Sequence, residues 1–308
     1  MDNALSQSIY HTLVYFDLFS YPLTREELYQ YLWEGPKLSY AEFFKALEQL
    51  DDDRIVFSEG YYMLAGKQAH ITVRRKRQWF VAKKMKIAKK AAKLYRYIPF
   101  VQAVYVCNQI QIGVDKDSDI DVFIVVKQGR IWITRFLVTM ITALRGIRRS
   151  NKKTTDRICL SFYGVDTALN FSAIRIDSSP DIYLAYWLKT LIPIYDPHHV
   201  YRRIQLENTW ADAHVRSKYE VHVSKEWFVK DHRMSKIVKR FFEIAWKGAY
   251  GDMVNNLAKG LQDTKMKKNR KSIQYEADSR VIISDNILKF HENDRRKLFQ
   301  KLWQEAVA

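Results

Sequence analysis

The chain opens with apolar residues spaced as on one face of a helix. Over residues 6–19, Ile9, Leu13 and Phe16 stand at positions i, i+4 and i+7, and Tyr21-Pro22 ends the pattern. This spacing predicts a first helix whose apolar side faces a core.

Two short helices and a hairpin are expected next. Each helix, at about 25–33 and 40–50, follows a Thr or Ser that has a Glu three residues later, the pattern of a capping box. Residues 54–57 and 61–64 are β-prone runs separated by a turn that contains glycine, which is typical of a β-hairpin. Three helices and a hairpin indicate a winged helix over residues 1–66.

Residues 67–98 contain twelve Lys or Arg and no Asp or Glu. Their apolar residues recur at helical spacing and predict a long helix with one buried stripe: Phe80, Ile87, Ala91, Leu94 and Ile98. A solvated face that only confers solubility would normally mix both signs of charge. The absence of acids therefore favours a surface that follows the phosphates of RNA or DNA. Pro99 ends this helix.

The stretch 104–126 contains two β-like apolar runs around a polar turn, and the second run contains Asp119 and Asp121. Residues i and i+2 of a strand project to the same face, so these two carboxylates should lie side by side. Two adjacent carboxylates repel each other unless a cation lies between them, and oxygen ligands suit Mg²⁺. The alternative is a solvated strand edge with incidental acids.

The rest of the chain is expected to complete a central domain and a helical tail. A helix at 131–147, strands at 157–163 and 168–176, and a helix from Asp181 assign residues 99–197 to the central domain. Residues 198–308 are expected to be helical. Six aromatic residues are expected in the core of this last region: Trp210, Trp227, Phe228, Phe241, Phe242 and Trp246.

Charge is distributed unevenly along the 308 residues, whose net charge is +17. Residues 1–60 contain four Lys or Arg against eleven Asp or Glu, so the excess of positive charge lies in the rest of the chain. A basic surface indicates nucleic acid as a partner. The acidic winged helix would be repelled by DNA, which favours a protein partner or packing within the chain.

The two cysteines, Cys107 and Cys159, both lie in apolar strand-like runs and are expected to be buried thiols in a reducing cytoplasm. No basic segment followed by an apolar one stands at the N-terminus. The longest apolar candidate, 131–144, is too short to span a bilayer, so no membrane partner is expected.

Residues 100–197 resemble the nucleotidyltransferase superfamily, which has the DNA polymerase β-like fold. In that family a Gly-Gly or Gly-Ser pair precedes, by a short spacer, Asp-hydrophobic-Asp or Glu on the next strand. Here Asn108-Gln109 replace the small pair, nine residues follow, and Ser118 leads into Asp119-Ile120-Asp121-Val122. The resemblance makes Asn108, Gln109 and Ser118 candidates for contact with the nucleotide, because the family's small pair lets the backbone approach the triphosphate.

The resemblance extends beyond this domain. The phrases CLSF, DIYLAY, PIYD and SDNILKFHENDRR have close counterparts in a group of bacterial proteins that join a winged helix to such a domain. It implies an α+β fold with an N-terminal winged helix, a central mixed sheet flanked by helices, and a helical C-terminal region.

The activity that the resemblance implies is transfer of a nucleoside monophosphate from an NTP to a hydroxyl acceptor. Asp119 and Asp121 would hold Mg²⁺ or Mn²⁺. The family's third strand supplies a third carboxylate, but 157–163 contains none, and Asp156 and Asp166 lie just outside it. Asp156 is the candidate for the third ligand or for the base that activates the acceptor.

A second hypothesis is a non-catalytic protein that keeps this fold to bind nucleic acid or to regulate a partner. Asn108-Gln109 and the missing third acid favour it, whereas the intact Asp119 and Asp121 oppose it. A role in a toxin–antitoxin system rests on analogy, because minimal nucleotidyltransferases and winged helices both occur there.

Overall fold

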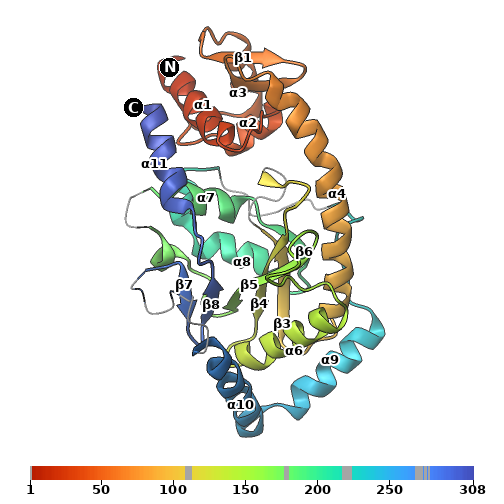
Figure 1. Cartoon of the computed structure of the whole chain (residues 1–308). Coiled ribbons are helices and arrows are strands. Elements are labelled where there is room, and N and C mark those ends of the chain that lie inside the picture. Colours follow the sequence, from red (N-terminus) through yellow and green to blue (C-terminus); the bar gives the residue numbers. More distant parts are fainter. Residues whose placement is uncertain are drawn as a thin grey trace.

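The computed structural model describes residues 2–107, 113–176, 180–216, 224–267, 273, 276 and 278–308. These residues form an α+β protein in which helices surround one large mixed β-sheet (Figure 1). None of the described helices is long and apolar enough to cross a lipid bilayer.

Three helices and a hairpin form an N-terminal unit, residues 2–64. Its elements are α1 (Asp2–Asp17), α2 (Arg25–Tyr31), α3 (Tyr40–Glu48), β1 (Ile55–Ser58) and β2 (Tyr61–Leu64). Both expected capping boxes are confirmed, one between Thr24 and Glu27 and one between Ser39 and Glu42. In each, the hydroxyl accepts from the Glu amide while the carboxylate accepts from the amide of the cap residue.

The predicted basic helix is α4 (Ala69–Tyr95), which runs along one side of the molecule from the N-terminal unit to the sheet (Figure 1). Two of its basic side chains are buried. The Arg74 guanidinium binds the Glu27 carboxylate at 2.6 Å. The Lys84 ammonium donates to the Ser118 carbonyl at 2.6 Å and to the Asp156 carboxylate at 2.9 Å. Helix α4 thus contacts both the N-terminal unit and the turn that precedes the acidic pair.

Within the described residues the large sheet has six strands in the order β6-β3-β4-β5-β8-β7. They are β3 (Val101–Val106), β4 (Ile120–Val126), β5 (Ile158–Val165), β6 (Ile192–Tyr195), β7 (Val281–Ile283) and β8 (Ile287–Phe290). Strands β4 and β5 are parallel, and the other neighbouring strands are antiparallel. The connection from β4 to β5 contains α6 (Ile131–Leu144), as a parallel pair requires a crossover.

Each face of the sheet has its own hydrophobic core, because successive side chains of a strand point to opposite faces. Val104 belongs to the core that α4 and α6 cover. Its neighbour Tyr105 belongs to the core formed with α7 (Ile182–Lys189), α8 (Val200–Glu207) and the N-terminal unit. The central strands are therefore apolar on both faces.

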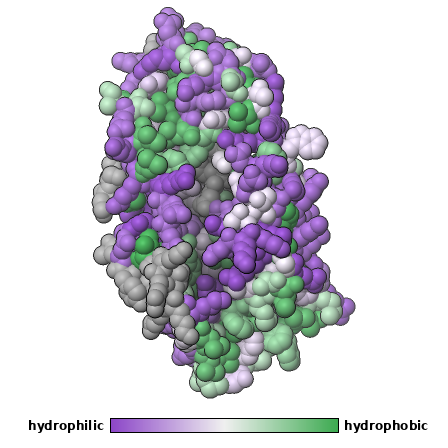
Figure 2. Space-filling model, viewed as in Figure 1, coloured by the Kyte–Doolittle hydropathy of each residue, from purple (hydrophilic) through white to green (hydrophobic). Residues whose placement is uncertain are grey.

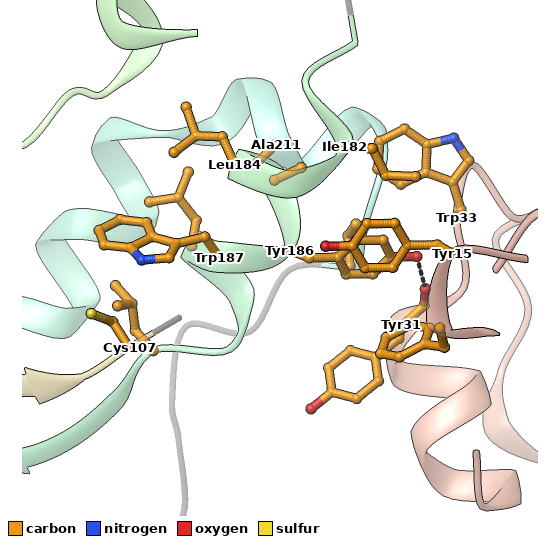
Figure 3. Packing of buried hydrophobic residues seen from close by; sticks show 14 of the residues in the cluster. Tyr15, Tyr31, Trp33, Cys107, Ile182, Leu184, Tyr186, Trp187 and Ala211 are labelled. Carbon is orange, nitrogen blue, oxygen red and sulfur yellow. Dashed lines mark hydrogen bonds between the residues drawn. The ribbon is translucent and has the colours of Figure 1, made fainter. Parts of the chain in front are cut away.

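The N-terminal unit shares one of these cores (Figure 3). Tyr186 of α7 is fully buried, and its hydroxyl donates to the Tyr31 carbonyl at 2.8 Å. Its ring stacks on Tyr15 with centroids 4.4 Å apart, and the Trp33 ring centroid lies 5.6 Å away. Direct contact with α7 thus fixes the N-terminal unit.

Two expectations about the later chain are wrong. Residues 168–176 form no strand but contain a short 3₁₀ helix, η1 (Ser172–Ile174). The C-terminal region is not wholly helical, since β7 and β8 join the sheet and β8 takes the place beside β5. Because β8 pairs with a strand far back in the chain, Tyr163 with Leu288, the local pattern could not reveal it.

The remaining C-terminal elements are helical: η2 (Thr209–Ala213), α9 (Arg233–Ala245), α10 (Gly248–Lys267) and α11 (Arg296–Val307). Helix α10 packs on α6, and α11 packs on α1 and α7. Four of the six expected core aromatic residues are partly buried, namely Trp210, Trp227, Phe228 and Trp246. The other two lie on α9 and are not core residues, because Phe241 is 64% exposed and Phe242 37%.

Candidate functional site

The two acids of the sequence motif lie together where β4 begins. Asp119 directly precedes the strand and Asp121 is its second residue, so alternation directs both side chains to one face. A carboxylate oxygen of each lies within 4.8 Å of the other and of the Cys159 sulfur. Both acids are partly buried.

Cys159 is the third member of this cluster, and the register of the parallel pair places it there. Asp121 pairs with Cys159 across β4 and β5, and paired residues of adjacent strands project to the same face. Burial, together with the charge of Asp121, raises the pKa of the thiol to about 12. The two carboxylates suit Mg²⁺ or Mn²⁺, whereas a thiolate beside them would suit a softer ion such as Zn²⁺ or Cd²⁺.

Arg149 places a cation at this cluster. Its guanidinium lies 2.9 Å from Asp119 Oδ2 and 3.4 Å from the Cys159 sulfur, while about half of its side chain stays exposed. Asp119 Oδ2 is shielded from solvent and forms no hydrogen bond of acceptable geometry with the described residues. A buried carboxylate oxygen with only an ion-pair partner is suited to bind a cation.

The other predicted site residues have different surroundings. The Asp156 carboxylate binds the ammonium groups of Lys83 at 2.6 Å and Lys84 at 2.9 Å, and it does not belong to the cluster of ligand atoms. The Ser118 hydroxyl accepts from the Asp115 amide at 2.9 Å and so stabilises the turn before β4. Asn108-Gln109 lie outside the described residues.

A cavity of about 400 Å³ adjoins the cluster, with Asp121, Arg149 and Cys159 in its wall. Phe162 of β5 and Trp187 of α7 add aromatic surface. The remaining wall includes residues 289–296, which run from the end of β8 to the first residue of α11. Carboxylates, a guanidinium and aromatic rings therefore meet in one space large enough for a small ligand.

Residues 289–296 bring titratable groups to this cavity. Burial lowers the pKa of Lys289 to about 8, although its ammonium binds the Asp294 carboxylate at 2.8 Å. His291 Nε2 lies 2.8 Å from the Ser161 hydroxyl. Burial lowers the pKa of His291 to about 3, so the ring is neutral at pH 7.

Buried ion pairs hold this segment in place. The Arg296 guanidinium binds Asp181 at 3.0 Å and Asp294 at 2.8 Å. Asp181 also caps α7 by accepting from the Leu184 amide at 2.9 Å. The wall of the cavity is thus tied to the start of α7, and charges that are buried and paired favour one geometry.

The sequence reasoning missed Cys159, Arg149 and residues 289–296 as parts of this site. Cys159 carried a usable signal, because it is the third residue of the strand at 157–163 that is expected next after the acidic one. Arg149 carried no signal beyond its place in a run of basic residues at 148–153. Residues 289–296 carried no positional signal, since their place depends on the pairing of β8 with β5.

No protein-family model, curated protein or solved structure matches this chain.

Proposed function

We propose that the chain is a nucleotidyltransferase that moves a nucleoside monophosphate from an NTP to a hydroxyl acceptor. The observation that carries this proposal is the pair Asp119 and Asp121, held on one face of β4 in the neighbourhood of a cavity of about 400 Å³. In this proposal residues 2–64 are a winged helix, and the large sheet is the nucleotidyltransferase-like domain.

A divalent cation, Mg²⁺ or Mn²⁺, bound by Asp119 and Asp121 would neutralise negative charge on the triphosphate. Arg149 can bind phosphate oxygens through two parallel N–H donors, since its guanidinium is half exposed beside Asp119. Phe162 and Trp187 offer aromatic surface to a base. Deprotonation of the acceptor by Asp156 requires its carboxylate to leave Lys83 and Lys84.

The acceptor in this proposal is RNA or DNA, bound at α4. The outer side of this helix carries basic residues along its length and one aromatic residue among them: Arg75, Lys76, Trp79, Lys83, Lys86, Lys90 and Lys93. Trp79 is 82% exposed, which suits stacking on a base. The acidic N-terminal unit would contact a protein partner.

The proposal is tested by incubating the full chain with each α-labelled NTP, Mg²⁺ or Mn²⁺, and total RNA. We expect label on an acceptor with the wild type and a loss of at least about 100-fold with Asp119→Asn/Asp121→Asn. The matched control is Asp117→Asn, because Asp117 is an exposed acid of the preceding turn. Transfer that survives the double substitution would overturn the site assignment.

A second candidate is a non-catalytic nucleic-acid-binding or regulatory protein, including a toxin–antitoxin component. The ion pair between Arg149 and Asp119 favours it, because a protein cation already neutralises one of the two acids. Binding of RNA by α4 without transfer from any NTP would support this candidate.

A further inference from the structure

Helix α9 packs its polar side against the rest of the protein. The buried Lys239 ammonium donates to the Val101 carbonyl and, at 3.2 Å, to the Tyr195 hydroxyl. The Glu243 carboxylate accepts from the Phe100 amide at 2.8 Å. The two charged side chains that point inward are therefore satisfied, and they fix which side of α9 points outward.

The outward side of α9 is apolar. Met234, Ile237, Phe241 and Ile244 follow each other at spacings of three and four residues, and each is more than half exposed. Helix α10 repeats this arrangement with its own outward residues: Tyr250, Met253, Leu257 and Leu261. Figure 2 shows hydrophobic side chains gathered at the end of the molecule that α9 and α10 form. We call these eight residues the apolar end.

The apolar end exposes more apolar area than a patch on a soluble protein usually does. At roughly 100 Å² of exposed area per large side chain, eight of them present on the order of 800 Å². Contiguous apolar patches beyond a few hundred Å² on a soluble protein mark a surface that something covers.

The charges beside the apolar end indicate an anionic partner. Three basic residues of α9 follow one edge of its apolar stripe, as helical periodicity places them, and we call them the basic row: Arg233, Lys236 and Arg240. Glu243 is turned inward, so it does not offset them. A second copy of the chain would bring its own basic row to the same contact, which disfavours self-association through α9.

We propose that the apolar end docks on the surface of an anionic lipid membrane. Amphipathic helices with Phe, Leu and Ile on one side and Lys and Arg beside them lie in the interface between headgroups and acyl chains. Such docking needs no spanning helix and no deep groove. On its outer side α10 has a shallow hollow, lined in part by Met253 and Leu257. The inference amends the sequence-based expectation that the protein has no membrane partner. It goes beyond the proposed activity and does not depend on Asp119 or Asp121.

Co-sedimentation of the full chain with vesicles tests this inference, using phosphatidylcholine alone or with phosphatidylglycerol. We expect the wild type to pellet with the anionic vesicles and less as salt is raised. Ile237→Glu with Phe241→Glu should abolish pelleting. Its matched control is Phe57→Glu with Leu206→Glu, two residues of similar exposure elsewhere on the surface, which should pellet as the wild type does.

The basic row is tested by Lys236→Gln with Arg240→Gln, which should weaken binding to anionic vesicles by about thirtyfold. All these side chains are exposed, so circular dichroism should show unchanged folding. A wild type that fails to pellet with anionic vesicles would overturn the inference. So would a wild-type dimer, seen by light scattering, that Ile237→Glu with Phe241→Glu converts to a monomer, because a second copy would then cover this surface.

Discussion

At the scale of single residues, Arg149 determines how readily the candidate site can bind a metal ion, because its guanidinium already contacts Asp119. Its guanidinium lies between Asp119 and Cys159, at 2.9 Å and 3.4 Å. Because half of the side chain is exposed, water screens its attraction to Asp119, which is worth less than about 1 kcal/mol. A divalent ion or a triphosphate could displace it at small cost.

We therefore expect Arg149→Ala to strengthen Mn²⁺ binding by about two- to fivefold, because a competing cation is removed. Calorimetric titration with Mn²⁺ measures this. Arg148→Ala removes the same charge from the neighbouring position and should leave the affinity unchanged. Equal Mn²⁺ affinity in wild type and Arg149→Ala would show that the ion does not bind at Asp119.

A second prediction concerns the Cys159 sulfur as a metal ligand. A soft ion such as Cd²⁺ should bind through the sulfur and produce thiolate absorption in the ultraviolet, since a bound ion offsets the burial that raises the thiol pKa. The band should disappear in Cys159→Ser. Cys107→Ser is the control, because Cys107 is the other buried thiol and does not belong to the cluster. A band that persists in Cys159→Ser would place the ion elsewhere.

His291 makes stability depend on pH. Burial holds its pKa at about 3 in the folded chain, below the ordinary value of 6.5. Between these values the unfolded chain binds the proton and the folded chain does not. The free energy of unfolding should therefore fall by about 1.4 kcal/mol for each pH unit between 6.5 and 3, and stay constant above 6.5. Urea denaturation at pH 7 and 5.5 should show a smaller loss in His291→Gln than in the wild type.

At the scale of elements, α4 is both a basic surface and a structural support. Lys83 and Lys84 bind the same Asp156 carboxylate, but Lys84 is buried and Lys83 is 65% exposed. Replacing each lysine in turn removes the same charge from Asp156, so a difference in the free energy of unfolding reports the effect of burial.

Lys84→Met should lower the free energy of unfolding by about 3 kcal/mol, because it removes a buried ammonium that donates to the Ser118 carbonyl and leaves the Asp156 carboxylate with Lys83 alone. Lys83→Met should cost less than about 1 kcal/mol, since its ion pair is exposed. Urea denaturation compares the two variants. If both cost the same, Lys84 does not support the turn before β4.

At the scale of the whole molecule, the N-terminal unit and the sheet share one hydrophobic core. Tyr186 connects them, with Tyr15 stacked on its ring and its hydroxyl bound to the Tyr31 carbonyl. Trp303 of α11 adds a second tie by donating from its indole nitrogen to the His11 carbonyl at 2.9 Å. An isolated N-terminal unit would expose this contact to water.

We expect the wild type to unfold in one calorimetric transition that includes both parts. Tyr186→Ala should lower the free energy of unfolding by about 3–5 kcal/mol, because it leaves a large cavity between them. Its control is Tyr40→Ala, an exposed tyrosine of α3. Two separate transitions in the wild type would show that the N-terminal unit folds independently.

The sequence by itself determined the features that depend on near neighbours. The capping boxes at Thr24 and Ser39, the hairpin and the basic helix follow from spacings of a few residues. The shared face of Asp119 and Asp121 follows from the pleat of a strand.

Only the tertiary structure decided which distant segments meet. Cys159 lies beside Asp121 because the parallel strands β4 and β5, which are joined by a crossover, pair in one register. Strand β8 lies beside β5 although more than a hundred residues separate them in the sequence. An amphipathic pattern gives α9 two faces but does not say which one points inward. There Lys239 and Glu243 hydrogen-bond to Val101 and Phe100, so the polar face lies against the protein and Phe241 stays exposed. These partners lie more than a hundred residues away in the chain, and for that reason the local pattern could not show the orientation.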